Sequence, residues 1–563
     1  MIEEFIKDPR IAYFSMEIAI RNEIPTYSGG LGIIAGDSIR SGADLELPLV
    51  AVSLVSQEGY FRQEIDGTGN QVEKADTWDP ARFTTPLGAK ISVQIEGREV
   101  WIKSWLYILE GPLRGRIPII FLDTNLEDNR QDDRELTSFL YGGDEAYRLK
   151  QEIVLGIGGV RILRALGFRI RHFHLNEGHS ALLGLELLRR HSFPLENVRA
   201  GENQYDILKV REMCNFTTHT PVDAGQDKFS YDLVKRIMGD LIDFSVLKSL
   251  AGEEYLNMTL LGLNLSEHIN GVAKRHAEIS QRMFPGYHVV AVTNGVHPFT
   301  WTHPSFGKIY FQYIPGWCDE PGMMVRVDQI PDEAIWNAHS LAKKELIAKV
   351  NDLLGVRLNS EIPILGFARR MTAYKRPDLI FFDLERLKAI ARKFPFQIVL
   401  AGKAHPRDEQ GKRLIGLLHD HIAKLTDIIP MVFLPNYNME LAHTLVSGVD
   451  VWLNTPQRPL EASGTSGMKA AFNGVPSLSV LDGWWIEGCI EGVTGWAVGD
   501  DLELSNLNDS DSLYSKLENK ILPLYFQDRS GWIRVMKGAI GKNSSFFNSH
   551  RMMRRYAVGS YIR

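Results

Sequence analysis

Short apolar runs alternate with segments of helical periodicity along most of the sequence. The runs are rich in β-branched residues, and each ends near Gly, Asn, Thr or His, which is typical of buried strands. In the first half they lie at residues 11–17, 48–56, 117–124, 168–178, 212–221 and 288–296. In the second half they lie at residues 362–370, 396–404, 429–437, 448–455 and 475–483. Strands that alternate with helices predict parallel sheets covered on both faces.

A segment rich in Pro and Gly, residues 304–324, interrupts the pattern between the two halves. We therefore predict an N-terminal α/β domain over residues 1–303 and a C-terminal α/β domain over residues 304–563. The predicted fold class is α/β, with two doubly wound, Rossmann-like domains that face each other across a deep cleft. We expect the last helices to pack back on the N-terminal domain.

Ligands of doubly wound sheets bind beyond the carboxyl ends of the strands. The polar residues that directly follow the apolar runs are therefore the first candidates for a functional site. They include His219, Asn294, Arg369, Arg370 and Lys403.

Composition and charge exclude several classes of protein. The chain has 563 residues and a net charge of −6, so no excess of basic residues favours nucleic acid as a partner. Its three cysteines are far apart, which argues against a disulfide framework or a zinc site and suits a reducing compartment. The first ten residues are charged and unlike a signal peptide, and no apolar run approaches the roughly 20 residues of a membrane span. We predict a cytoplasmic protein without a membrane partner.

The stretch EASGTSGMK, residues 461–469, follows one apolar run and precedes a helical pattern. Its small residues allow backbone N–H groups to approach an anion, Ser463, Thr465 and Ser466 add hydroxyl donors, and a helix start favours negative charge. The spacing of Gly and Lys is wrong for a Walker loop. Lys469 could instead form a Schiff base with pyridoxal phosphate while the loop holds the phosphate group. A capped helix with a solvated lysine is an equally good interpretation of the composition alone.

EASGTSGMK closely resembles the pyridoxal-phosphate loop of the glycogen (α-glucan) phosphorylases, which typically reads EASGTGNMK. Other segments resemble motifs of that family in the same order and extend from about residue 11 to about residue 490. These segments are SGGLGIIAGDSI (28–39), TTHT (217–220), VTNGVHPFTW (292–301), ARRMTAYKRP (368–377), AGKAHP (401–406), FLPNY (433–437) and VLDGWWIEG (480–488). Any one motif would be weak evidence, whereas the ordered set is specific.

The resemblance implies a GT-B glycosyltransferase architecture with pyridoxal 5′-phosphate bound in the C-terminal domain. Lys469 matches the lysine that binds the cofactor, whose phosphate group exchanges a proton with the phosphate substrate. Arg370 and Lys375 match residues that hold the substrate phosphate, and Arg369 matches one that holds the cofactor phosphate. Without the resemblance, this cluster would be a solvated basic turn. Gly464, Thr465, Ser466, Tyr437 and Trp301 lie at positions near the cofactor, although core packing is the default interpretation of both aromatic residues.

Other matched residues lie on the sugar side of the implied site. Gly29 and Gly30 match a glycine loop at a helix start that faces the substrate phosphate, although sugar-nucleotide transferases share such loops. His219 matches a histidine over the transferred sugar, and a lone histidine is otherwise more often structural. Asn294, Glu461 and Ser463 match residues that bind the glucosyl hydroxyls.

The resemblance also implies the reaction. Inorganic phosphate would attack the α-1,4 bond at the non-reducing end of a glucan, with retention, and release α-glucose 1-phosphate. No pair of carboxylates of the glycosidase kind is then needed. A homodimer is the usual assembly of the family, although the shorter chain leaves its dimer segments in question.

Three features depart from the family or allow another interpretation. Gly467 replaces the usual Asn of the cofactor loop, and Trp484 and Trp485 replace small or polar residues, either to stack on a sugar or to fill space. The phosphorylated N-terminal extension of animal enzymes has no counterpart, so we expect no such regulation. HLNEGHSA (174–181) lacks the spacing of a zincin site, and we assign no metal.

Two alternatives share some of these features. A sugar-nucleotide glycosyltransferase, similar to glycogen synthase, would have the glycine loop and the cleft but would not need Lys469. A non-catalytic glucan-binding protein could derive from a decayed enzyme, but decay should first remove the charged residues that are all present here.

Overall fold

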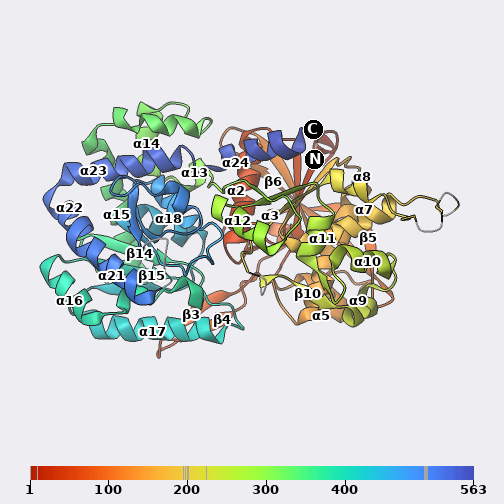
Figure 1. Cartoon of the computed structure of the whole chain (residues 1–563), viewed down its shortest axis with the longest axis horizontal. Helices are drawn as coiled ribbons and strands as arrows, with labels where there is room; N and C mark the ends of the chain where they lie inside the picture. Colours follow the sequence, from red (N-terminus) through yellow and green to blue (C-terminus); the bar gives the residue numbers. More distant parts are fainter. Residues whose placement is uncertain are drawn as a thin grey trace.

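The computed structural model describes residues 2–8, 10–194, 196, 198–199, 202–222, 225–499 and 505–562. Within these residues, the larger sheet has nine strands, and the part from β13 to β7 is parallel, as predicted (Figure 1). Its strand order is β13 (Val290–Ala291), β12 (His268–Gly271), β9 (Cys214–Thr217), β8 (His172–Asn176), β1 (Ile11–Phe14), β2 (Leu49–Leu54), β7 (Arg116–Asp123), β6 (Arg98–Glu110) and β5 (Thr85–Ile95).

The edge formed by β6 and β5 is antiparallel, so the expectation of purely parallel sheets was wrong for this part. The two strands form a long hairpin that closes at Glu96 and Gly97, which both have positive φ, 52° and 73°. Two consecutive residues with positive φ are the requirement of the type I′ turn that suits a twisted hairpin. A strong local turn therefore pairs these strands with each other instead of leading into a crossover helix.

The smaller sheet is parallel throughout and contains all five strands that the second half of the sequence predicts. Among the described residues it has six strands, in the order β16 (Met431–Leu434), β15 (Gln397–Ala401), β14 (Ile364–Ala368), β17 (Val451–Asn454), β18 (Ser477–Val480) and β19 (Gly495–Val498). The strand β19 was not predicted. The Pro- and Gly-rich segment after residue 303 is largely helical, with α14 at Pro304–Tyr313 and a 3-10 helix at Pro321–Gln329.

Both sheets are covered on both faces. In β1, Ala12 and Phe14 belong to one apolar cluster, whereas Ile11 and Tyr13 belong to another, as the period of two requires. Around the larger sheet lie α2 (Gly30–Asp44), α5 (Glu145–Ile153), α6 (Gly159–Ala165), α7 (Leu183–Arg190), α8 (Ile207–Met213), α9 (Tyr231–Met238), α10 (Phe244–Ala251), α11 (Met258–Asn264) and α12 (Lys274–Met283). Around the smaller sheet lie α15 (Asp332–Leu354), α16 (Leu384–Lys393), α17 (Glu409–Leu425), α18 (Met439–Gly448), α21 (Asn506–Lys516), α22 (Leu522–Gln527) and α23 (Arg529–Gly538).

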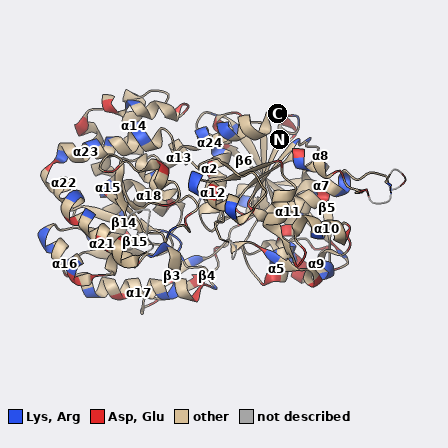
Figure 2. Cartoon of the chain, viewed as in Figure 1, with Lys and Arg blue, Asp and Glu red and all other residues tan. Residues whose placement is uncertain are grey.

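Two segments connect the two sheets. The hairpin of β3 (Arg62–Ile65) and β4 (Gln71–Lys74) reaches the second half, where Gln63 Nε2 donates to the carbonyl of Gly402 at 2.8 Å. The C-terminal helix α24 (Ser549–Tyr556) returns to the first half and packs against α2 (Figure 1). Acidic and basic residues are both scattered over the elements of the two halves (Figure 2). Within the described residues, no helix combines the length and apolar character that a membrane span requires.

Candidate functional site

The loop EASGTSGMK connects β17 to a short helix, α19 (Ser466–Ala471), so the predicted strand–loop–helix arrangement is confirmed. Gly464 has φ of +79°, a left-handed conformation that favours glycine. Thr465 stands at the N-cap position, but its hydroxyl makes no capping bond. Ser466 Oγ accepts a hydrogen bond from Trp452 Nε1 at 3.0 Å, which fixes the start of the helix against β17. The loop therefore presents backbone N–H groups and one hydroxyl that are not used in capping.

Lys469 is buried on α19, with only 6% of its surface exposed. Its Nζ lies 3.8 Å from the centre of the Trp301 ring, close enough for a cation–π contact. Trp301 in turn donates from Nε1 to Asp37 Oδ2 at 2.8 Å, so the indole is held by α2. Burial lowers the pKa of Lys469 to about 8, although the Asp37 carboxylate opposes this shift. About a tenth of the lysine is therefore a neutral, nucleophilic amine at pH 7.

Arg369 and Lys375 converge on one carboxylate. Glu461 Oε2 lies 2.7 Å from Arg369 Nη2 and 2.6 Å from Lys375 Nζ. Burial disfavours the charged form of Glu461, but the two cations outweigh it and lower its pKa to about 2. Arg369 also contacts Asn454 Oδ1. Two of the three predicted phosphate-binding cations are therefore close together, and both are paired with a predicted sugar-binding residue.

Arg370 differs from its two neighbours because its side chain is exposed and, within the described chain, makes no hydrogen bond or ion pair. A Cβ added to Gly29 would lie 3.5 Å from Arg370 Nη2, so the guanidinium stands over the glycine loop. Gly29 is the N-cap of α2 and provides no side-chain cap, and a Cβ added to Gly30 would meet nothing within 4 Å. A helix start with free N–H groups under an arginine is an anion-binding arrangement.

Glu17 organises this glycine loop, and the sequence analysis did not single it out. Its Oε2 accepts the backbone N–H groups of Ser28 at 2.5 Å and of Gly29 at 3.1 Å. Its Oε1 accepts the hydroxyl of Tyr141 at 2.8 Å. Glu17 is buried three residues after β1, so an acid directly after a buried run was the available signal. By using the N–H groups of Ser28 and Gly29, the carboxylate leaves those of the first turn of α2 to a ligand.

His219 follows β9 and is held at both its main chain and its ring. Its backbone N–H donates to Glu177 Oε2 at 2.7 Å, and its Nε2 lies 2.7 Å from Asn176 Oδ1. Desolvation lowers the pKa of His219 to about 3, so the ring is neutral at physiological pH. Burial raises the pKa of Glu177 to about 7, although the hydrogen bond from the backbone N–H of His219 opposes this shift. Glu177 has φ of 73° and ψ of 174°, a strained conformation that is usual only for glycine and is found at functional sites.

Asn294 and Ser463 each bury a polar atom without a partner. Asn294 Oδ1 and Ser463 Oγ have no hydrogen bond within the described residues. Such atoms are rare in folded proteins, because burial without a partner costs about 1–3 kcal/mol. Tyr437 is half-buried, and burial raises its pKa despite the nearby Arg369. These unsatisfied atoms are consistent with a site that receives hydrogen bonds from a polar ligand.

Trp484 and Trp485 are both buried in the core of the second half, where they contact each other and Phe547 contacts Trp484. Of the two roles considered for them, filling space is therefore favoured over stacking on a sugar. Among the described residues, His174, Glu177 and His179 belong to no group of three or more His, Cys, Asp or Glu side chains arranged to hold a metal ion. His174 instead hydrogen-bonds Thr217 and Tyr561.

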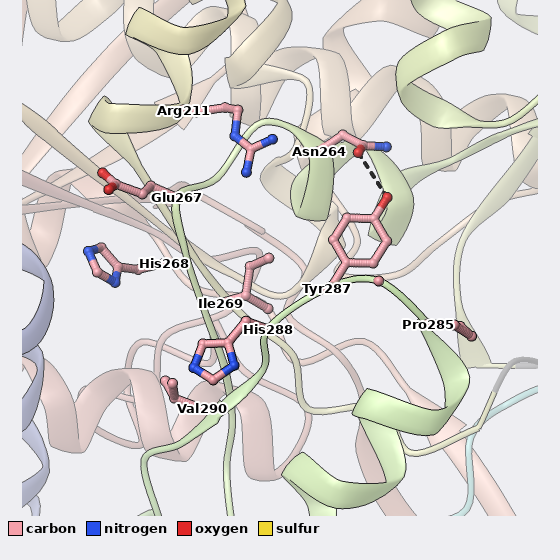
Figure 3. Close-up of a pocket in the computed structure, with 10 residues that line it drawn as sticks. Arg211, Asn264, Glu267, His268, Ile269, Pro285, Tyr287, His288 and Val290 are labelled. Carbon is pink, nitrogen blue, oxygen red and sulfur yellow. Dashed lines mark hydrogen bonds between the residues drawn. The ribbon is translucent and has the colours of Figure 1, made fainter.

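A surface hollow of about 560 Å³ lies elsewhere, at the edge of the larger sheet (Figure 3). His268 begins β12 there, so the hollow is at the amino end of that strand rather than at its carboxyl end. Tyr287 donates to Asn264 Oδ1 at 2.8 Å, whereas Arg211 and His288 project from separate segments (Figure 3). The hollow contains none of the predicted site residues.

The chain is similar in sequence to several known proteins. The sequence profile of the family described as carbohydrate phosphorylase matches residues 240–494. The chain is 39% identical to maltodextrin phosphorylase from Thermococcus litoralis, over 98% of this chain and 70% of that protein. It is 36% identical to glycogen phosphorylase from Aquifex aeolicus, over 98% of this chain and 86% of that protein. It is also 34% identical to glycogen phosphorylase from Mycobacterium tuberculosis, over 98% of this chain and 70% of that protein.

Proposed function

The chain belongs to the carbohydrate phosphorylase family, and we propose that it is an α-1,4-glucan phosphorylase. Inorganic phosphate attacks C1 of the terminal glucosyl unit, the C1–O4 bond breaks, and the leaving O4 takes up a proton. The products are α-D-glucose 1-phosphate, formed with retention, and a glucan shorter by one unit. The observation that carries the proposal is the burial of Lys469 on the short helix that follows a glycine- and hydroxyl-rich loop.

The residues around Lys469 fit pyridoxal 5′-phosphate. A buried amine with a pKa lowered to about 8 is suited to a covalent bond with an aldehyde. Gly464 allows the left-handed turn that leads into α19, and the Thr465 hydroxyl is not used as a cap. Lys469, Arg369, Gly464, Thr465, Ser466, Tyr437 and Trp301 would hold the cofactor. When bound, its phosphate group supplies an acid and base near neutral pH, since the second pKa of a phosphate monoester is about 6.

Arg370, Lys375 and the start of α2 hold the phosphate substrate in this proposal. The planar guanidinium of Arg370 offers two parallel N–H donors, and the N–H group of Gly30 lies at the positive end of a fifteen-residue helix. Lys375, which pairs with Glu461, would contribute a positive charge to the phosphate as well. Together with Arg369, these groups offset the repulsion between two phosphates that must lie side by side.

His219, Asn294, Glu461 and Ser463 bind the transferred sugar. The two buried atoms without partners, Asn294 Oδ1 and Ser463 Oγ, would be satisfied by sugar hydroxyls. The main-chain carbonyl of His219 would face the positive charge that develops on the sugar. We propose that domains 1–303 and 304–563 face each other across the site. Water is excluded from the reaction when the two domains close the cleft between them. We further propose a cytoplasmic location and a homodimer.

Cofactor mapping tests this proposal, with Lys403 as a matched control. Lys403 also follows a strand, and burial lowers its pKa to about 8, but its Nζ donates to the carbonyl of Phe61. The protein is incubated with pyridoxal phosphate, reduced with borohydride and mapped by peptide mass. We expect the adduct on Lys469 and phosphate-dependent release of glucose 1-phosphate from maltodextrin. An unmodified Lys469, with glucosyl transfer from a sugar nucleotide, would contradict the proposal and favour the synthase-like alternative.

A further inference from the structure

The ring of His219 is the first member of a chain of hydrogen bonds that ends in a backbone carbonyl. His219 Nε2 lies 2.7 Å from Asn176 Oδ1. Asn176 Nδ2 donates to Ser15 Oγ at 3.0 Å, and Ser15 Oγ donates to the carbonyl of Glu17 at 2.7 Å. Asn176 and Ser15 are almost completely buried, with 1% and 0% of their surface exposed. Water is therefore not a competing partner for the inner part of this chain.

The backbone carbonyl fixes the direction of every donor in the chain. A carbonyl oxygen only accepts, so the single proton of the Ser15 hydroxyl is committed to Glu17 O. Ser15 Oγ must then accept from Asn176, which places the Nδ2 amide group toward Ser15 and Oδ1 toward His219. The opposite orientation of the Asn176 amide would direct Oδ1 at a hydroxyl that has no second proton to give. Because Oδ1 only accepts, the proton of the neutral imidazole must be on Nε2.

We propose that Ser15 and Asn176 are positioning residues that hold His219 in the Nε2–H tautomer and leave Nδ1 as an acceptor for a donating hydroxyl of the transferred sugar. The second part rests on the proposed function, whereas the tautomer does not. The histidine is held from two sides, since Glu177 accepts its backbone N–H at 2.7 Å. The ring is uncharged at neutral pH because desolvation lowers its pKa to about 3.

Selectivity for the sugar follows from this assignment. An imidazole nitrogen without a proton binds a hydroxyl that can donate, and it repels a group that only accepts. At the position whose hydroxyl donates to Nδ1, an analogue with fluorine should therefore bind no more tightly than one with hydrogen. At positions that receive hydrogen bonds from N–H or O–H donors, fluorine should retain part of the affinity of the hydroxyl.

The tautomer can be measured directly in the full chain. Protein labelled with ¹⁵N-histidine is studied by long-range ¹H–¹⁵N correlation, and the His219 signals are assigned from the variant His219→Gln. We expect a neutral ring protonated at Nε2. In Ser15→Ala, Asn176 loses its fixed acceptor, and we expect a detectable fraction of the Nδ1–H form. An Nδ1–H ring in the unaltered protein, or no change in Ser15→Ala, would overturn the proposal.

Two further variants make the result specific. Ser53 is also buried next to this chain and donates to the carbonyl of Met16 at 3.3 Å, so Ser53→Ala is the control and should leave the tautomer unchanged. Asn176→Asp keeps an acceptor for Nε2–H and adds a negative charge. It should retain the tautomer and raise the pKa of His219 by at least one unit. If Ser15→Ala does not fold, an unshifted pKa in Asn176→Asp would still contradict the proposal.

The sugar contact is tested by binding rather than by turnover, because fluorine also slows formation of an oxocarbenium-like transition state. Dissociation constants are measured for glucose 1-phosphate analogues in which one hydroxyl at a time is replaced by fluorine or by hydrogen. At one position we expect both analogues to bind about tenfold more weakly. Recovery by fluorine at every position would exclude Nδ1 as an acceptor. If no analogue binds and the Nε2–H tautomer is still observed, the proposed function fails while the positioning role remains.

Discussion

The indole of Trp484 occupies the space that a side chain at position 467 would need. A Cβ added to Gly467 would lie 2.7 Å from Trp484 Cζ2 and 2.8 Å from Ser477 Oγ. Trp484 is 2% exposed and cannot move toward solvent without opening the core. The two departures from the family's motifs, glycine at position 467 and tryptophan at position 484, are therefore in direct packing contact.

Gly467→Ala should be destabilising because of this contact. Over-packing a tight core costs about 1–3 kcal/mol, so we expect a lower free energy of unfolding and weaker retention of pyridoxal phosphate. Gly307→Ala is the matched control, since Gly307 is also helical but a Cβ there meets nothing within 4 Å. Urea unfolding and cofactor absorbance measure both effects. If Gly467→Ala and Gly307→Ala had the same free energy of unfolding, the packing explanation would be wrong.

Glu17→Gln should weaken phosphate binding and leave the apparent affinity for glucan largely unchanged. The amide keeps one oxygen for the N–H groups of Ser28 and Gly29 but loses the negative charge, and hydrogen bonds to a charged acceptor are about twice as strong as those to a neutral one. We expect KM for phosphate to rise about tenfold, equivalent to about 1.4 kcal/mol. Initial rates at varied phosphate and varied maltodextrin separate the two constants.

A decrease in KM for phosphate in Glu17→Gln would contradict this role of Glu17. If Glu17 mainly repels the phosphate, its neutral variant would bind phosphate more tightly. Glu23→Gln is a suitable control, because Glu23 is exposed and pairs with Arg21 on the surface. Its kinetic constants should not change.

The sequence predicted the parallel strands well because their runs are short, apolar and buried on both sides. It did not predict the hairpin of β5 and β6, in which buried residues are interspersed with half-exposed and exposed ones. The pairing of these two strands depends on the local turn at Glu96 and Gly97. The strand β12, with the sequence HING, has too few apolar residues to give a pattern. Strand prediction therefore failed where burial is one-sided or where the strand has too few apolar residues.

The motifs also predicted residues that the fold brings together, including Arg369, Lys375 and Glu461. The supporting residues could not be found in this way, because each acts on a partner far along the chain. Asn176 contacts His219 across 43 positions, and Tyr141 contacts Glu17 across 124. A buried carboxylate such as Glu17 has the same sequence signature whether it organises a loop or pairs with a distant cation. Only the fold distinguishes the two roles.

Glu461 should make stability depend on acid pH. Its pKa is about 2 in the folded protein, below the ordinary value of 4.5. A lowered pKa stabilises the folded state above about pH 4.5, and this contribution of about 3 kcal/mol is lost as pH falls through 2. The unfolding free energy of Glu461→Gln should therefore fall less steeply between pH 5 and pH 3 than that of the unaltered protein. Parallel curves would contradict the ion pairs.

The same variant should respond more strongly to phosphate. Removing the carboxylate leaves Arg369 and Lys375 unpaired and close together, which we expect to cost about 3–5 kcal/mol at neutral pH. Inorganic phosphate can replace the lost negative charge, so its addition should raise the melting temperature of Glu461→Gln more than that of the unaltered protein. Arg370→Gln added to Glu461→Gln should reduce the response, because Arg370 is the exposed member of the cluster. Equal responses would show that the cluster does not bind phosphate.

Lys469 should react with aldehydes in a way that depends on pH through its lowered pKa. Since only the neutral amine is nucleophilic, the rate of reductive labelling should rise about tenfold per pH unit below pH 8 and level off above it. An exposed lysine, with a pKa near 10.4, continues to rise over this range. Asp37→Asn removes the carboxylate that holds Trp301 and opposes the shift, so the break should move to lower pH. A profile that still rises at pH 10 would show that Lys469 is not desolvated and would remove the basis for its reactivity.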